Sequence, residues 1–326
     1  MKTHAFLLHA YGGPEVLNWE EVELPEPGRN EVLIRNTAIG LNFAEIYLRM
    51  GQFGGKLPTG IGLEAAGVVE KTGPGVRKFK AGDRVGYTGA ATPGAYAEAV
   101  LRPTDGLVKL PKWLDDKTAA AVLTKGMTVQ YLFNRTHKLK KGDTILFTAV
   151  AGGVGQIAVQ WAKAVGARLI GTVGTDDKAA LAKRIGAREL IVHARQNMYE
   201  EVMRLTNGQG VDVVYDSIGK DTWLDSLKSV KKRGLVVCFG HASGHPPPYD
   251  VVRDGLANSA YIHRATTVNY VTTDEERQAA ARHLFRMLKS GAVKARIGQT
   301  YPLRDAPRAQ ADMAARKTTG STVLLP

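Results

Sequence analysis

The sequence predicts an α/β protein in which a doubly wound parallel sheet is inserted into an antiparallel, barrel-like β domain. Three observations indicate this arrangement. A glycine cluster separates a strand-like run from a helix-like run within residues 144–163. Strand and helix patterns then alternate up to residue 239, with strands at intervals of roughly twenty residues. Before residue 120, short strands are punctuated by glycine and proline, which is typical of an antiparallel β domain.

The amino-terminal part of the chain carries the short β-type runs. The predicted strands are Lys2–His9, Val16–Glu23, Glu31–Ile39, Ala65–Lys71, Arg84–Tyr87 and Ala95–Val100. Two helical segments interrupt them, one at Asn42–Met50 and one that begins at Leu114–Ala121. This part is expected to form most of the antiparallel domain.

The segment Thr144–Lys163 begins the parallel sheet. It opens as an apolar, β-branched run, breaks at Gly152, Gly153 and Gly155, and continues with apolar residues at helical spacing. In such a unit, free N–H groups and the positive end of the helix dipole receive a pyrophosphate, and glycine lets the backbone approach it. Ala149 stands where the commoner fingerprint has its first glycine, so the motif alone is a weak signal.

The elements that follow support a dinucleotide-binding interpretation. The predicted strands are Arg168–Val173, Glu189–His193, Val211–Tyr215 and Leu235–Phe239, with helices at Asp177–Ile185, Met198–Leu205 and Thr222–Val230 between them. This alternation predicts a Rossmann-type sheet with helices on both faces.

The carboxyl-terminal segment, residues 274–326, is again of mixed character. Its predicted elements are a helix at Glu275–Leu288, a strand near Gly298–Tyr301, a helix at Ala306–Ala315 and a strand at Ser321–Leu325. It is too short to form a domain alone and is expected to complete the first one. The predicted domains are therefore 1–124 with 263–326, which is catalytic, and 125–262, which binds the dinucleotide. We expect the substrate in the crevice between them.

Composition excludes several other classes of protein. The single cysteine, Cys238, excludes an internal disulfide and zinc sites built from several thiolates. No signal peptide precedes Tyr11–Pro14, and glycine interrupts the uncharged stretch Thr144–Ala162, so neither secretion nor membrane insertion is expected. The cytoplasm is the expected location.

The net charge of +13 raises the question of a polyanionic partner. The basic residues are scattered, with small clusters at Lys138–Lys141 and Lys231–Arg233 next to predicted strands. RNA is therefore a possible but unfavoured partner, and a phosphate-bearing cofactor suits the charge equally well.

Eight motifs occur in order along nearly the whole chain. They are Gly12–Leu17, Gly40–Tyr47, Gly62–Val69, Ala81–Val85, Lys125–Thr128, Ala151–Gly155, Tyr215–Gly219 and Arg316–Ser321. In this order they resemble the zinc-free quinone oxidoreductases of the medium-chain dehydrogenase/reductase superfamily, the group that includes ζ-crystallin. The resemblance implies that the first domain is GroES-like.

The resemblance also bears on zinc. Zinc-dependent relatives hold the catalytic metal with a cysteine in the segment around Asn42 and a histidine before the glutamate of the Gly62–Val69 segment. This chain has Asn42 and Leu63 in these segments, although Glu64 is kept. A catalytic zinc needs about three protein ligands, so we expect no metal.

The cofactor is expected to be NADPH. The second strand of the parallel sheet ends in Gly174-Thr175, which leaves space for a 2′-phosphate, and Lys178 follows in the next helical turn. The resemblance places a lysine and a tyrosine on that phosphate, but this chain has His193 at the tyrosine position. Asp176-Asp177 lie close by and argue for NADH instead, unless they only cap the helix.

The remaining site residues follow from the resemblance. Asn42 and Tyr47 are the candidate catalytic residues and also contact the nicotinamide; Tyr47 either donates a proton or only positions the cofactor. The other expected cofactor-binding residues are Thr124, Thr128, Gly152, Gly153, Val154, Gly174, Thr175, Lys178, His193, Ser217, Phe239, Gly240, His241, Arg264 and Arg316.

The resemblance implies NADPH-dependent, zinc-independent reduction of quinones. One alternative keeps NADPH and reduces the C=C bond of α,β-unsaturated aldehydes or ketones. Another is an NADPH-regulated RNA-binding or structural protein, which salt-sensitive RNA retention abolished by NADPH would favour. The resemblance also implies a homodimer that pairs at an edge strand near Tyr261–Val268.

Overall fold

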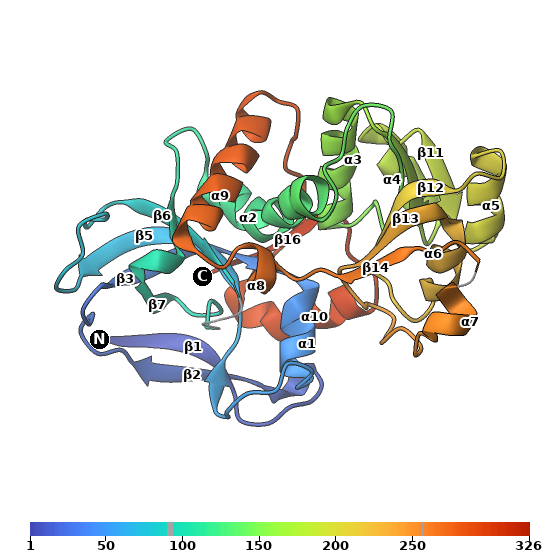
Figure 1. Cartoon of the computed structure of the whole chain (residues 1–326). Coiled ribbons are helices and arrows are strands. Elements are labelled where there is room, and N and C mark those ends of the chain that lie inside the picture. The colour runs from blue at the N-terminus through green and yellow to red at the C-terminus, as the bar shows by residue number, and fades with distance from the viewer. Residues whose placement is uncertain (90–93, 256) are drawn as a thin grey trace. The chain divides into compact units, whose positions relative to one another are not determined.

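A computed structural model (Figure 1) describes residues 1–89, 94–255 and 257–326. The chain forms two compact units. The first comprises Met1–Met127, Val271–Leu284 and Ala295–Pro326, and the second comprises Thr128–Tyr270 and Phe285–Lys294. The domain boundaries at 124/125 and 262/263 stay a prediction, because compact packing alone does not show which segments fold together.

The second unit contains one parallel sheet. Its strands are β9 (Thr144–Phe147), β10 (Arg168–Val173), β11 (Glu189–Val192), β12 (Val211–Asp216), β13 (Val230–Cys238) and β14 (Tyr261–Arg264). They lie in the order β11-β10-β9-β12-β13-β14, and every neighbouring pair is parallel. The strand order changes direction between β9 and β12, which is where a doubly wound sheet binds its ligand, at the carboxyl ends of the strands.

Helices cover both faces of this sheet. They are α3 (Gly153–Val165), α4 (Asp176–Arg184), α5 (Met198–Leu205) and α6 (Trp223–Ser229), with the shorter α7 (Val251–Gly255) and α8 (Thr267–Tyr270) near the end of the unit. Because such crossovers are right-handed, α3 and α4 lie on one face and α5 and α6 on the other. In agreement, α5 packs against α6. Side chains such as Leu146, Ile170 and Val214 form the fully buried core between the layers.

The first unit is built mainly from antiparallel strands. A small sheet has the order β2-β1-β4, and a larger one has the order β15-β16-β3-β5-β6-β8, with β7 also paired to β3. The strands are β1 (Lys2–Leu8), β2 (Leu17–Glu23), β3 (Glu31–Leu41), β4 (Thr59–Gly60), β5 (Glu64–Thr72), β6 (Arg84–Thr88), β7 (Ala99–Pro103), β8 (Leu107–Lys109), β15 (Ile297–Pro302) and β16 (Ser321–Leu325). The carboxyl-terminal β16 pairs with β3, so the end of the chain completes this unit. The predicted fold class is confirmed.

The helical elements of the first unit include the one that carries the candidate catalytic residues. They are α1 (Phe43–Arg49), α2 (Asp116–Tyr131), α9 (Asp274–Lys289) and α10 (Ala306–Ala314), with short helical turns at Pro14–Val16, Thr104–Gly106 and Leu303–Asp305. Both α2 and α9 continue into the second unit, and α2 ends in a π-helical turn at Leu132–Thr136.

The strand predicted at Ala95–Val100 begins later, at Ala99. The buried amide of Asn36 donates to the carbonyl oxygens of Ala95 (3.1 Å) and Ala97 (2.8 Å). These side-chain bonds satisfy two carbonyl oxygens of the segment, which is joined to β1 by an isolated bridge between Ala97 and Ala5 and does not form a regular strand. A second difference is that β15 and β16 are parallel, within a sheet that was expected to be antiparallel.

Candidate functional site

The candidate cofactor residues of the second unit follow the carboxyl ends of the strands of the parallel sheet. Gly152, Gly153 and Val154 follow β9; Gly174, Thr175 and Lys178 follow β10; His193 follows β11; Ser217 follows β12; Phe239, Gly240 and His241 follow β13; and Arg264 ends β14. Because all these strands are parallel, their carboxyl ends share one edge of the sheet. Residues spread over more than a hundred positions of sequence are thus collected along this edge.

The glycine turn after β9 has the geometry of an anion-binding loop. Ala149 takes a left-handed backbone conformation with φ of 56°, which glycine adopts more easily. Its carbonyl oxygen accepts from the Gly152 N–H at 3.0 Å, which closes the turn before α3. A side chain at Gly155 would come within 2.5 Å of the Cα of Val150, so only glycine fits there. The first N–H groups of α3 have no intrahelical acceptor and are available to a phosphate.

Small and basic groups follow β10 and β11. Gly174 is exposed with open space beside it, and the Thr175 hydroxyl caps α4 by accepting from the Lys178 N–H at 3.4 Å. Asp176 lies 3.1 Å from the guanidinium of Arg195, so this acidic side chain is paired with a base. Arg195 was not among the residues predicted from the sequence; its position just after the third strand of the parallel sheet is the signal that was available. Besides Lys178, it is a second cation in the segments that follow β10 and β11.

Buried polar contacts shape the loops after β12 and β13. The Ser217 N–H donates to the Thr148 hydroxyl at 2.9 Å, and the two hydroxyl oxygens lie 3.1 Å apart. Gly240 packs so closely that a side chain there would come within 2.8 Å of the Ser217 carbonyl oxygen. The ring of Phe239 packs on that of Phe147, with centroids 5.4 Å apart. These loops therefore form a compact edge with Ser217 on it.

His241 and Arg264 lie together at the ends of β13 and β14. Arg264 donates to the Cys238 carbonyl oxygen at 3.0 Å. Burial, together with the positive charge of Arg264 and the neighbouring His245, lowers the pKa of His241 to about 4. His241 is therefore neutral near pH 7 and is suited to packing and to hydrogen bonding without a charge.

Thr128 lies beside a buried tyrosine in the second unit. Burial raises the pKa of Tyr131 to about 12, while Thr267, Arg264 and Thr128 act in the opposite direction. The ring of Tyr131 stacks on Tyr270, with centroids 4.8 Å apart. The Tyr131 phenol thus stays protonated and lies near two predicted cofactor residues, Thr128 and Arg264.

In the first unit, Asn42 belongs to a buried polar cluster with Glu45, Glu64 and Lys125. The amide nitrogen of Asn42 donates to Glu64 at 2.9 Å and to Glu45 at 3.3 Å, while its oxygen accepts from Lys125 at 2.7 Å. Burial raises the pKa of Glu45 to about 7, and the positive charge of Lys125 opposes this rise. The sequence identified only Asn42 as a site residue, and Glu64 only as the remainder of a zinc motif.

The other candidates of the first unit are more dispersed. Tyr47 is 8% exposed, and its ring lies 5.3 Å from that of Phe43 and 6.0 Å from that of Phe53. Thr124 donates its N–H to Glu64 at 2.7 Å, which joins it to the Asn42 cluster. Arg316 is exposed and follows α10 with a left-handed backbone, φ of 60°. The structure therefore connects Thr124 with Asn42.

The residues near Asn42 do not fit a zinc ion. In the described parts of the chain, no group of three or more His, Cys, Asp or Glu side chains could hold a metal. Leu63 offers no ligand atom, and the ammonium of Lys125 lies 3.5 Å from the Glu64 carboxylate. A cation already lies beside the glutamate that the zinc motif retains.

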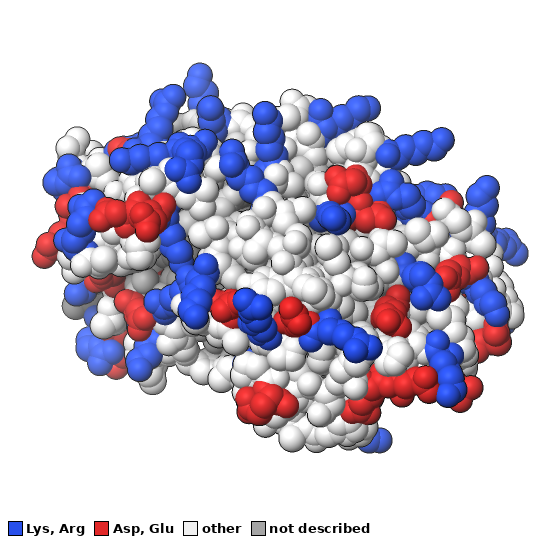
Figure 2. All heavy atoms as spheres, turned by 180° about the vertical axis from the view of Figure 1, so that it is seen from behind, with Lys and Arg blue, Asp and Glu red and all other residues white. Residues whose placement is uncertain are grey.

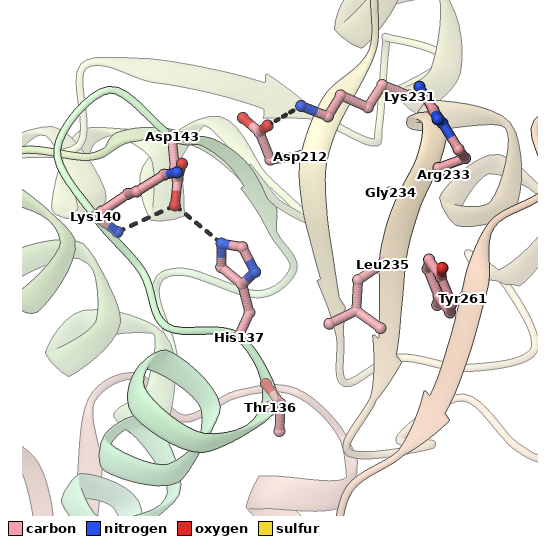
Figure 3. Close-up of a pocket in the computed structure, with 10 residues that line it drawn as sticks. All are labelled: Thr136, His137, Lys140, Asp143, Asp212, Lys231, Arg233, Gly234, Leu235 and Tyr261. Carbon is pink, nitrogen blue, oxygen red and sulfur yellow. Dashed lines mark hydrogen bonds and ion pairs between the residues drawn. The ribbon is translucent and has the colours of Figure 1, made fainter.

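A separate pocket of about 530 Å³ lies on the opposite side of the parallel sheet, where the strands begin (Figure 3). Lys140, Lys231 and Arg233 from the two basic clusters of the sequence line it. Figure 3 shows His137 facing Asp143, with an N–O distance of 2.9 Å, and Lys231 reaching Asp212. Its residues adjoin the amino ends of β9, β12 and β13, so this pocket is not the cofactor site.

Across the described residues, no helix has the length and apolar character that a membrane span requires.

Comparisons with known proteins agree with this architecture. The profile of the family described as "Alcohol dehydrogenase GroES-like domain" matches residues 28–112, and that of "Zinc-binding dehydrogenase" matches residues 153–285. A quinone oxidoreductase of Pseudomonas aeruginosa is 49% identical over 97% of this chain and 98% of its own length. A 2-haloacrylate reductase of a Burkholderia species is 44% identical over 99% of this chain and 98% of its own length.

A solved structure is also similar over its whole length. The crystal structure of the Escherichia coli quinone oxidoreductase complexed with NADPH superposes with a TM-score of 0.96 and 43% identity. The match covers 99% of this chain and 100% of that one.

Proposed function

Since the chain belongs to the quinone oxidoreductase family of the medium-chain dehydrogenase/reductase superfamily, we propose that it reduces quinones with NADPH and without zinc. The proposal rests mainly on one observation: the glycine turn after β9 and the loops after the other parallel strands all lie at the carboxyl ends of the sheet. In such folds a dinucleotide binds at the carboxyl ends of the parallel strands.

The preference for NADPH over NADH is supported by the loops after β10 and β11. Gly174 leaves open space where an acidic side chain would bind a ribose hydroxyl. Lys178 and Arg195 are bases suited to a 2′-phosphate, and Asp176 is occupied by its ion pair with Arg195. Asp176, one of the two acidic residues that argued for NADH, is therefore a weaker objection to NADPH.

The cofactor supplies the hydride when it is bound, and the protein orients the reactants and excludes water. We assign the phosphates to the first turn of α3 and to the loops after β10 and β11. Ser217, Phe239, Gly240, His241, Arg264, Thr128 and Arg316 are assigned to the remaining cofactor contacts. Asn42 and Tyr47 are assigned to the nicotinamide and the acceptor, where Tyr47 either donates a hydrogen bond or a proton to an acceptor oxygen or holds the cofactor in place.

Zinc independence, a homodimer and a cytoplasmic location complete the proposal. The donor set around Asn42 supports zinc independence, because Leu63 offers no ligand atom and the ammonium of Lys125 lies 3.5 Å from the Glu64 carboxylate. The edge strand β14 supports a dimer, since Tyr261 and Ile262 on it are exposed. The single cysteine is compatible with a reducing compartment.

Reduction of an activated C=C bond is the second candidate. It is favoured by the full-length similarity to a 2-haloacrylate reductase. Such a reaction needs a proton at carbon after hydride transfer, so it depends on Tyr47 or water as a donor.

A panel of acceptors separates the two candidates. NADPH oxidation is followed by the loss of nicotinamide absorbance with 1,4-benzoquinone, 9,10-phenanthrenequinone, a 2-alkenal and 2-chloroacrylate. We expect turnover with the quinones. Turnover with only the alkenal or the haloacrylate would replace the quinone assignment with C=C reduction, and NADPH binding without any turnover would favour a binding protein.

A further inference from the structure

Lys125 is a buried cation next to a candidate catalytic residue. Its Nζ donates to Oδ1 of Asn42 at 2.7 Å and lies 3.5 Å from Oε2 of Glu64. Only 5% of Lys125 is exposed, and Glu64 and Glu45 are fully buried. Burial removes the hydration of these charges, so each depends on the others for compensation.

The neighbours of Asn42 accommodate one orientation of its amide. Nδ2 donates to Oε2 of Glu64 and to Oε1 of Glu45. A carboxylate only accepts and an ammonium only donates, so a flipped amide would set its NH₂ group against Lys125 and its oxygen against the carboxylates. Both hydrogens of the Asn42 amide are therefore bound by carboxylates. Its Oδ1 accepts from Lys125 and has one lone pair left for a ligand.

The same cluster fixes the beginning of α1. The backbone N–H of Asn42 donates to Oε2 of Glu45 at 2.9 Å, and the N–H of Leu63 donates to Oε1 of Glu45 at 3.2 Å. Asn42 is the N-cap of α1, the helix that carries Tyr47. A change in the cluster would therefore move both candidate catalytic residues.

We propose that Lys125 is a positioning residue for hydride transfer. It holds the Asn42 amide with its carbonyl oxygen available to the nicotinamide or the acceptor, and it stabilises the amino end of α1. This inference rests on the proposed function, in which Asn42 and Tyr47 act at the nicotinamide. Lys125 acts through Asn42 and is assigned no contact with the cofactor.

A double-mutant cycle tests whether Lys125 acts through Asn42. Lys125→Met should lower kcat with NADPH and a quinone by about tenfold or more, and change the KM for NADPH by less than about threefold. In an Asn42→Ala background the same change should lower kcat by less than about twofold. Equal losses in both backgrounds, or an unchanged kcat in Lys125→Met, would overturn the proposal. If Lys125→Met does not fold, Lys125→Leu, which also removes the donor, replaces it under the same criterion.

Hydrogen exchange tests the positioning role without cofactor or turnover. Amide exchange in peptides covering residues 42–52 should be at least about tenfold faster in Lys125→Met than in the parent protein. Lys117→Met is the matched control, since Lys117 is an exposed lysine on the same helix α2, and it should leave that exchange unchanged. Unchanged exchange in Lys125→Met would overturn the proposal. Faster exchange in Lys125→Met, together with a parent protein that does not turn over quinones, would contradict the proposed function instead.

Discussion

Ala149 has a left-handed backbone at the turn between β9 and α3. This conformation costs an L-residue about 1–2 kcal/mol, whereas a glycine costs about 0.5–1 kcal/mol through the entropy of the unfolded chain. We therefore expect Ala149→Gly to leave the free energy of unfolding unchanged or to raise it by about 1 kcal/mol. Ala180→Gly at an exposed position of α4 should lower it by about 1 kcal/mol. Urea titrations of both variants measure the free energy of unfolding. An equal loss of this free energy in the two variants would show that the backbone at Ala149 is not strained.

We expect Arg195 to be the residue that distinguishes NADPH from NADH most directly. Arg195→Ala removes one cation and releases the carboxylate of Asp176. A lost charge-assisted hydrogen bond of about 1.5 kcal/mol should raise the Kd for NADPH roughly tenfold and leave that for NADH nearly unchanged. Titration of nicotinamide fluorescence measures both constants. Lys183→Ala, an exposed lysine on α4, is the control, and an equal weakening for both cofactors would refute the assignment.

The buried carboxyl group of Glu45 makes the stability of the first unit depend on pH. Its folded pKa of about 7 lies above the ordinary value of 4.5, chiefly because of burial. Between these values the folded protein binds more protons than the unfolded chain, so its stability falls as the pH rises. Glu64, Lys125, Tyr96 and the Asn42 amide surround this carboxyl group.

Glu45→Gln removes this titration. The free energy of unfolding of the parent, minus that of the variant, should decrease by up to roughly 3 kcal/mol between pH 5 and pH 8. Urea unfolding at several pH values measures the difference. Parallel curves for the two proteins would show that Glu45 does not titrate in this range.

At the scale of elements, β14 is the exposed edge of the parallel sheet. It pairs with β13 on one side, and Tyr261 (67%) and Ile262 (38%) are exposed on it. An exposed apolar edge strand is a site for pairing with a second copy of the chain. We expect the parent protein to be a dimer by light scattering and Ile262→Lys to be a monomer. Leu224→Lys, at an exposed apolar position of α6, should remain dimeric; a monomeric parent would refute the dimer.

Local patterns predicted the parallel sheet better than they predicted the Asn42 cluster. Strand periodicity and glycine turns are local, so the residues that follow β9 and β10 were found from them, whereas Ser217, which follows β12, came from the family resemblance. Lys125 and Glu64 are 61 positions apart, and their contact depends on the packing of α2 within the first unit. No local pattern encodes that contact. The roles assigned to Asn42, Tyr47 and the cofactor residues stay predictions.

At the scale of the whole molecule, the scattering of the basic residues along the sequence leaves RNA the less favoured ligand. The chain has 44 basic and 31 acidic residues. On the face shown in Figure 2, the basic side chains lie in several separate places with acidic side chains among them. Binding along an RNA backbone instead calls for a clustered basic surface. The excess charge is compatible with attraction of a phosphorylated cofactor.

We propose that this chain transfers hydride from NADPH to a quinone without a metal. The most direct test is kcat/KM for NADPH and for NADH with 1,4-benzoquinone, before and after dialysis against a chelator. We expect NADPH to exceed NADH by about tenfold or more, with no loss after dialysis. An equal or higher value for NADH would contradict the NADPH assignment, and activity lost on dialysis and restored by zinc would contradict the metal-free mechanism.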